Sequence, residues 1–241
     1  TIAAETADAL TALIGAMAGM ARNTARTAER RARLAETTAR ARAEAQKTAR
    51  ADAARGITKA YASLCLSEAL EDRVSTVFSE LGTFLGPLER RAHRSWVQEP
   101  HAGGLGWSFP AALGAKLADP ARTCVATPGD GSYMFANPVA CHQVAEALGL
   151  GVLVMVLNNS EWGAVRKSVT QLYPDGHAAQ SNAMPLTGLM PSPEFTKIAE
   201  ASRAFARRVD DPADLPGAIA EALAATDAGR CALLDVRTLP D

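Results

Sequence analysis

The hydrophobic pattern divides the chain into two regions, and the first of them, residues 1–56, is helical in character. Apolar side chains recur there at helical spacing only over residues 7–20. They are Leu10, Leu13, Ile14 and Met17. Residues 21–55 are polar on nearly all sides apart from their alanines and Leu34, which is typical of a solvated or domain-bridging helix. We therefore expect a helical segment whose first helix packs its apolar face on another surface.

From residue 57 onward, short apolar runs alternate with helical periods. The pattern predicts strands at 74–78, 123–127, 152–157 and 232–236, and helices at 57–70, 109–117, 137–148, 193–206 and 215–225. The run Val152–Leu157 is apolar without interruption, as expected of a parallel strand that is buried on both faces. Strands that alternate with helices predict an α/β fold, with three α/β/α layers around a mainly parallel sheet. A helical linker precedes this fold.

Composition narrows the classes of function. The 241 residues suffice for one core or for one domain with an appendage. The formal net charge of -1 argues against a protein whose whole surface binds nucleic acid. Many arginines fall within residues 22–55, and we interpret them as the solvated face of a helix. Nucleic-acid binding is the alternative for that stretch, but no aromatic residue or motif supports it.

Cysteine usage and the N-terminal region bear on location. None of the four cysteines forms a CxxC pair, so no zinc or redox motif is visible. We expect a reducing, cytoplasmic compartment. The apolar segment Leu10–Met20 is too short to span a bilayer and has no basic stretch before it, so we expect neither a membrane anchor nor a signal peptide. The chain begins at Thr1, which suggests a fragment or a processed chain.

Polar and glycine residues come after two of the predicted strands. Gly129-Asp130-Gly131-Ser132 comes directly after the strand at 123–127, and Asn158-Asn159-Ser160-Glu161-Trp162-Gly163 directly after the strand at 152–157. Ligands bind at the carboxyl ends of strands in open parallel sheets. Glycines allow close approach of an anion, a helix start after them supplies N–H groups, and Asp130 and an asparagine offer hard oxygen ligands for Mg²⁺. A divalent ion with a diphosphate is the economical interpretation. Taken alone, the first motif could be a tight turn and the second a helix N-cap.

Together the two motifs resemble the signature of thiamine diphosphate (ThDP) enzymes, which is GDG(S) followed by NN. Gly103 to Ala115 resembles the GGLGxxxPAAxGA segment of the acetolactate synthase and benzoylformate decarboxylase branch. The resemblance covers residues 57–241 and implies the C-terminal pyrophosphate-binding (PP) domain of such an enzyme. Residues 1–56 would be the tail of a central domain plus a linker.

The resemblance also implies a role for each matching residue. Asp130 and Asn159 would bind Mg²⁺ through their side chains, and Glu161 through its main-chain carbonyl. The spacing leaves Asn158 open as the alternative to Asn159. The implied cofactor-binding residues are Gly103, Leu105, Gly129, Gly131, Ser132 and Trp162.

Two of these residues would also be catalytic. The Gly103 carbonyl would accept a hydrogen bond from the 4′-amino group of the cofactor. Leu105 would be the apolar wedge that bends ThDP into its V shape. Glu80, with Thr83, is expected near the diphosphate or the rim of the site. Structural roles are favoured for His101 and His142.

The implied activity is that of a ThDP- and Mg²⁺-dependent lyase or transferase. It would act on a 2-oxo acid by non-oxidative decarboxylation or carboligation, as acetolactate synthase-like enzymes do. The catalytic glutamate of such enzymes lies in a pyrimidine-binding domain, which nothing in this sequence resembles, so we expect that domain from the same or a neighbouring chain. A homodimer or homotetramer is implied. The alternative is a non-catalytic or split ThDP-binding subunit that needs a partner chain. A nucleotide-binding oxidoreductase is disfavoured, because no GxGxxG follows a strand.

Overall fold

The computed structural model describes residues 3–20, 23–99, 104–181 and 184–240. Contacts divide the chain into two compact units, Thr1–Ala41 and Arg42–Asp241. The first unit contains α1 (Thr6–Ala18) and the beginning of α2 (Thr24–Asp52). Both predicted helices are therefore present. No residue of α1 is buried.

The second unit is built on a parallel sheet of six strands in the order β2-β1-β3-β4-β6-β5. The strands are β1 (Ser75–Glu80), β2 (Trp96–Gln98), β3 (Thr123–Pro128), β4 (Val152–Asn158), β5 (Phe205–Val209) and β6 (Ala232–Arg237). The strands β3 and β4, which precede the two polar motifs, are neighbours, as the sequence predicts. The mainly parallel α/β sheet is confirmed.

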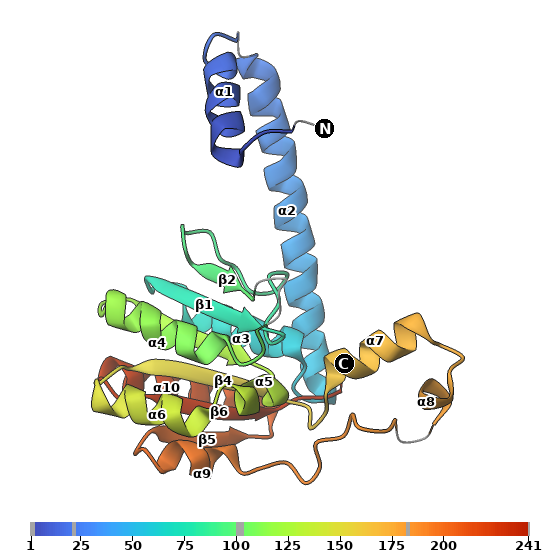
Figure 1. Ribbon diagram of the computed structural model, residues 1–241, viewed down its shortest axis with the longest axis vertical. Coiled ribbons are helices and arrows are strands. Elements are labelled where there is room, and N and C mark those ends of the chain that lie inside the picture. The colour runs from blue at the N-terminus through green and yellow to red at the C-terminus, as the bar shows by residue number, and fades with distance from the viewer. Residues whose placement is uncertain (1–2, 21–22, 100–103, 182–183, 241) are drawn as a thin grey trace. The chain divides into compact units, whose positions relative to one another are not determined.

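Helices cover both faces of this sheet (Figure 1). On one face lie α3 (Lys59–Ala69) and α10 (Leu215–Asp227), and on the other lie α4 (Ser108–Ala118), α6 (Pro138–Ala147) and α9 (Phe195–Glu200). Along β4, Leu153, Met155 and Leu157 belong to the first of the two hydrophobic clusters. Val152, Val154 and Val156 belong to the second. The apolar run of β4 is thus explained by burial on both sides, and the predicted three-layer arrangement is confirmed.

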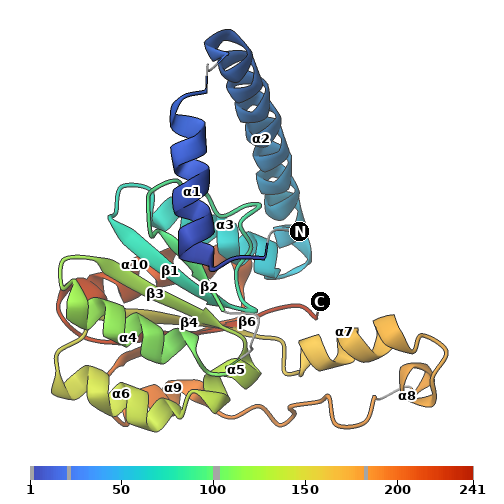
Figure 2. The same cartoon turned by 45° about the horizontal axis from the view of Figure 1, so that its top comes forward.

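The remaining short elements lie either at the ends of the strands or at the periphery of the domain. They are α5 (Asp130–Phe135), α7 (Gly163–Leu172), α8 (His177–Gln180) and the 3₁₀ turns Ala53–Arg55 and Pro212–Asp214. Figures 1 and 2 both show α5 and the start of α7 at the arrowhead end of the sheet. The two polar motifs of the sequence therefore begin helices at the same end of the sheet.

The hydrophobic pattern does not predict two of the strands, β2 and β5. The helix predicted over 193–206 is wrong beyond Glu200, because the chain turns there and Phe205–Val209 forms β5. Arg203 in this turn has a φ of 54°, a left-handed conformation that a continuing helix does not contain. The strand β2 has only three residues, too few to show a period of two. Both are edge strands of the sheet.

All four cysteines are buried and free. Within the described residues, no helix is both long enough and apolar enough to span a membrane.

Candidate functional site

A pocket of about 110 Å³ lies at the carboxyl ends of β3 and β4. Its lining includes seven of the residues singled out in the sequence, namely Leu105, Gly129, Gly131, Ser132, Asn159, Glu161 and Trp162. Asp130 is buried between two of the lining glycines. The structure thus brings together two motifs that are well separated along the chain. Gly103 and His101 lie outside the described residues.

Asp130 has an unpartnered carboxylate oxygen. Its side chain is buried, Oδ1 accepts a hydrogen bond from the Gly131 amide at 2.9 Å, and Oδ2 is buried with no hydrogen-bond partner. Burial raises the pKa of this carboxyl group, whereas the backbone N–H groups of Gly131, Ser160 and Glu161 lower it. Buried polar atoms are normally satisfied, so the free oxygen fits a cation better than it fits a closed core.

The two neighbouring asparagines make different contacts. Asn158 is buried at the end of β4, where Nδ2 donates to Asp235 Oδ1 at 2.8 Å and to Ser192 Oγ at 3.2 Å. Its Oδ1 accepts from the Ser160 amide at 3.0 Å. Asn159 lines the pocket, and its Oδ1 accepts a hydrogen bond from the Glu161 amide at 3.1 Å. The Asn158 side chain therefore links parts of the fold, while that of Asn159 faces the site.

The turn after Asn159 exposes main-chain atoms to the pocket. Ser160 has a φ of 58°, a left-handed conformation that is costly for a residue other than glycine and is often found at functional sites. The Glu161 side chain pairs with Arg166 at 2.7 Å, and its carbonyl accepts from the Gly163 amide at 2.8 Å. A carbonyl oxygen has a second lone pair, so Glu161 can still offer main-chain oxygen to a ligand.

The described residues contain no group of three or more His, Cys, Asp or Glu side chains that could hold a metal. A metal in this pocket would need amide, carbonyl and ligand oxygens beside the single carboxylate of Asp130. Mg²⁺ accepts such a set, because it binds oxygen ligands and is often held by one or two carboxylates together with phosphate oxygens. The donor set is compatible with a Mg²⁺–diphosphate pair.

Gly131 is required by the packing of an aromatic ring. A Cβ atom at this position would lie 2.1 Å from Cζ3 of Trp162. The same indole meets Phe135 edge-on, with ring centroids 5.7 Å apart. Only glycine lets the start of α5 lie this close to Trp162, so the second glycine of the motif joins α5 to the segment before α7.

Glu80 and Thr83, expected near the diphosphate or the rim of the site, are not among the residues that line the pocket, although Leu81, which follows Glu80, is. Glu80 is fully buried, and its carboxylate accepts hydrogen bonds from the Gly106 amide at 2.6 Å and the Ser108 amide at 2.8 Å. The Thr83 hydroxyl shares a hydrogen bond with the Thr127 hydroxyl at 3.0 Å. These partners are distant in sequence, and no local pattern indicates such contacts.

His142 has the structural role expected of it. It is buried on α6, with Nε2 2.9 Å from the Tyr133 hydroxyl and Nδ1 3.6 Å from Cys231 Sγ. Burial lowers the pKa of His142 to about 4 and raises the pKa of Cys231 to about 12. A neutral imidazole can accept from Tyr133 and donate to Cys231. This chain of polar groups connects α5, which follows β3, with α6 and β6.

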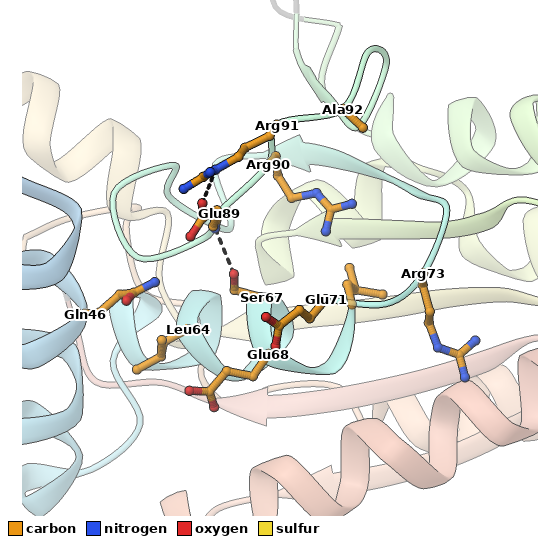
Figure 3. Close-up of a pocket in the computed structure, with 11 residues that line it drawn as sticks. Gln46, Leu64, Ser67, Glu68, Glu71, Arg73, Glu89, Arg90, Arg91 and Ala92 are labelled. Carbon is orange, nitrogen blue, oxygen red and sulfur yellow. Dashed lines mark hydrogen bonds and ion pairs between the residues drawn. The ribbon is translucent and has the colours of Figure 1, made fainter. Parts of the chain in front are cut away.

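A larger hollow of about 640 Å³ contains none of the predicted site residues (Figure 3). Its lining carries both charge signs, with Glu68, Glu71, Glu89, Arg73, Arg90 and Arg91. Glu89 pairs with Arg91, and its amide donates to the Ser67 hydroxyl at 2.8 Å. The smaller pocket is the candidate site, because it is the one that the residues of the two motifs line.

Comparison with known proteins agrees with this geometry. The family model described as "Thiamine pyrophosphate enzyme, C-terminal TPP binding domain" matches residues 82–236. The acetolactate synthase large subunit of Buchnera aphidicola subsp. Acyrthosiphon pisum is 30% identical over 145 residues, which is 60% of this chain and 24% of that protein. Acetolactate synthase isozyme 3 large subunit of Escherichia coli (strain K12) is 32% identical, over 59% of this chain and 23% of that protein.

A solved structure extends the similarity to the fold. The thiamine diphosphate-dependent 4-hydroxybenzoylformate decarboxylase of Rhodococcus jostii RHA1 superposes with a TM-score of 0.66 and 26% identity, covering 77% of this chain and 33% of that chain. The chain spans about a quarter of the length of the two acetolactate synthase subunits. The family match covers well over half of the chain, and the chain therefore belongs to the family of C-terminal thiamine pyrophosphate-binding domains of thiamine pyrophosphate enzymes.

Proposed function

We propose that residues 57–241 form the PP domain of a ThDP- and Mg²⁺-dependent enzyme that acts on a 2-oxo acid. The reaction is non-oxidative decarboxylation or carboligation, the chemistry named in the acetolactate synthase and decarboxylase relatives. The observation that carries the proposal is the unpartnered buried oxygen of Asp130, which lies between two glycines of a pocket that Asn159 also lines. Residues 1–56 act as the tail of a central domain plus a linker.

The metal site in this proposal uses three residues from two strand ends. Asp130 and Asn159 supply side-chain oxygens, and Glu161 supplies its carbonyl oxygen. Asn158 is less suited, because its amide already links Asp235, Ser192 and the Ser160 backbone. Diphosphate oxygens would supply further ligands to the metal, next to the Gly129–Ser132 turn.

The cofactor side of the proposal concerns the walls of the pocket. Gly129, Gly131, Ser132 and Trp162 form the diphosphate wall, and Leu105 stands on the opposite loop as the wedge under the cofactor. Gly103, for which we propose the contact to the 4′-amino group, precedes the described part of that loop. When bound, ThDP would supply the electron sink that stabilises negative charge at the former carbonyl carbon of a 2-oxo acid. The apolar surfaces of Leu105 and Trp162 exclude water and orient the cofactor for that chemistry.

Exposed apolar residues at the rim of the pocket are the basis for proposing a surface that binds a partner domain. Leu81, Leu105 and Val165 line the pocket and stay 39% to 52% exposed. Phe84 and Phe135 are exposed nearby in sequence. Large apolar side chains that stay exposed around a pocket are typical of an interaction site. We propose that a pyrimidine-binding domain of the same or a neighbouring chain covers them in a cytoplasmic homodimer or homotetramer and supplies the catalytic glutamate.

The test is Mg²⁺-dependent binding of ThDP, measured by titration calorimetry. Wild-type protein should bind ThDP only with Mg²⁺ present. Asp130→Asn removes the charge of the metal ligand, so we expect affinity to fall at least about 100-fold, or about 3 kcal/mol. Asp72→Asn makes the same chemical change at an exposed position and should leave affinity unchanged.

Two results would contradict the proposal. The first is an absence of ThDP binding to wild-type protein at millimolar concentration with saturating Mg²⁺. The second is binding to Asp130→Asn as tight as binding to Asp72→Asn, which would remove Asp130 from the site.

A further inference from the structure

Glu80 lies at the junction of the two walls of the candidate pocket. It is the last residue of β1, and its carboxylate accepts the Gly106 and Ser108 amides at 2.6 and 2.8 Å. Its main-chain carbonyl accepts the Gly129 amide at 3.2 Å. One residue therefore binds both the loop that carries Leu105 and the turn that carries Asp130.

The loop is also held from its other side. Gly106 has a φ of 91°, and a Cβ atom there would lie 2.5 Å from the Ala136 nitrogen and from the Phe135 carbonyl carbon. Gly106 therefore packs directly on the end of α5. Leu105, which precedes it, lines the pocket from a loop clamped between Glu80 and α5.

The two hydrogen bonds require a carboxylate. The Gly106 and Ser108 amides are both donors, and a carboxylate offers an acceptor to each. Trp107, the N-cap residue of α4, provides no side-chain cap, so Glu80 caps this helix from a distant strand. Glutamine at this position would turn an amide nitrogen, itself a donor, toward one of the two N–H groups. In a fully buried site such a donor pair has no water to relieve it.

We propose that Glu80 is a positioning residue that fixes Leu105 in the cofactor pocket. The inference rests on the proposed function, in which Leu105 is the wedge beneath ThDP. Glu80 does not touch the cofactor in this proposal. It acts through the loop, and it couples the position of the wedge to the turn that holds the metal ligand.

The first test needs no cofactor and compares Glu80→Gln with Glu71→Gln, the same change at an exposed glutamate. Amide hydrogen exchange at Gly106 and Ser108 is measured by NMR on the 241-residue chain. In Glu80→Gln we expect at least about tenfold faster exchange at one or both amides. In Glu71→Gln we expect the exchange rates of both amides to be unchanged. Unchanged protection at both amides would overturn the inference, whatever the chain binds. If Glu80→Gln does not fold, Glu80→Asp is used, since its shorter carboxylate cannot reach both amides.

The second test is a double-mutant cycle in the holoenzyme with ThDP and Mg²⁺. The rate of C2–H exchange of bound ThDP is measured for Glu80→Gln, Leu105→Ala and the double variant. We expect each single change to slow exchange about tenfold and the double variant to be no slower than Leu105→Ala. If the double variant slowed exchange by the product of the two single effects, Glu80 would act other than through Leu105, and the inference would be overturned.

The two tests separate this inference from the proposed function. A protein that fails to bind ThDP contradicts the proposed function, while the amide exchange still reports whether Glu80 holds the loop. Normal C2–H exchange in Leu105→Ala rejects the wedge, and with it the functional part of the inference.

Discussion

Asn158 and Asn159 are adjacent in sequence, yet their side chains have different partners. Asn158→Ala removes the donor to Asp235 and leaves that buried carboxylate without its nearest hydrogen bond. We expect the free energy of unfolding to fall by about 1 to 3 kcal/mol. Asn159→Ala loses a contact to the Glu161 amide at a half-exposed position, so we expect little loss of stability but weaker Mg²⁺-dependent ThDP binding. Urea unfolding and titration calorimetry on both variants check this. If Asn158→Ala weakened ThDP binding and Asn159→Ala lowered stability instead, Asn158 would be the metal ligand.

His142 gives the fold a pH dependence. Burial lowers its pKa from 6.5 to about 4, so between these values the unfolded chain binds a proton that the folded chain does not. The free energy of unfolding therefore falls as pH drops from about 6.5 to about 4 and is unaffected by this group above 6.5. At pH 4.5 we expect a loss on the order of 2 to 3 kcal/mol relative to pH 7.

The contribution of His142 can be isolated with His142→Gln. The two groups that contact the imidazole nitrogens, Tyr133 and Cys231, both have pKa values raised by burial and stay protonated in this range. Buried Asp130 and Asp235 have raised pKa values, so they oppose the trend by favouring the folded state as pH falls. Urea unfolding at pH 7 and 4.5 should therefore show a smaller loss in His142→Gln than in wild type. An equal loss would place the pH dependence on other groups.

At the residue scale, the sequence predicts the side chains that come directly after strand ends. Asp130, Asn159 and Trp162 are found around one pocket because the carboxyl ends of neighbouring parallel strands meet. The role of Glu80 could not be predicted, since its partners lie on another segment and the residue looks like any acid at the end of a strand. The same holds for Gly131, whose requirement comes from a ring that the fold brings against it.

At the scale of elements, the turn between α9 and β5 shows why the pattern failed over residues 193–206. The apolar residues continue at helical spacing through the turn, but the backbone reverses at Arg203, whose φ of 54° is left-handed. Arg203→Gly relieves the left-handed conformation, so we expect the free energy of unfolding to rise by about 1 kcal/mol. The change also removes an exposed ion pair to Glu146, which is worth little. Arg203→Ala loses the ion pair but keeps the strain, so it should not be stabilised in thermal unfolding; equal behaviour of the two variants would show that backbone strain at this position is not the cause.

The short edge strands are the other elements that the hydrophobic pattern does not predict. Central strands such as β4 are predicted well because burial on both faces demands an unbroken apolar run. At the edges, β2 is only three residues long and β5 is mostly half-buried with two arginines. Their positions depend on pairing with β1 and β6 rather than on their own sequence.

At the scale of the whole molecule, the open question is what covers the apolar rim of the pocket. Phe84 is 49% exposed in the loop after β1, the strand whose neighbour β3 leads into the pocket. If this rim is the surface for a pyrimidine-binding domain, Phe84→Asp places a charge in an interface core, where desolvation opposes association. We expect the dissociation constant of the assembly, measured by analytical ultracentrifugation, to rise at least about tenfold. Leu117→Asp is the matched control, since Leu117 is 59% exposed near the end of α4 and no residue within three positions of it lines the pocket, whereas Phe84 is three positions from the lining residue Leu81. Both variants remove one exposed apolar side chain and add one charge. Weaker association in Phe84→Asp alone would therefore locate the partner at the pocket rim. Equally weakened association in both variants would mean that the partner covers a different surface.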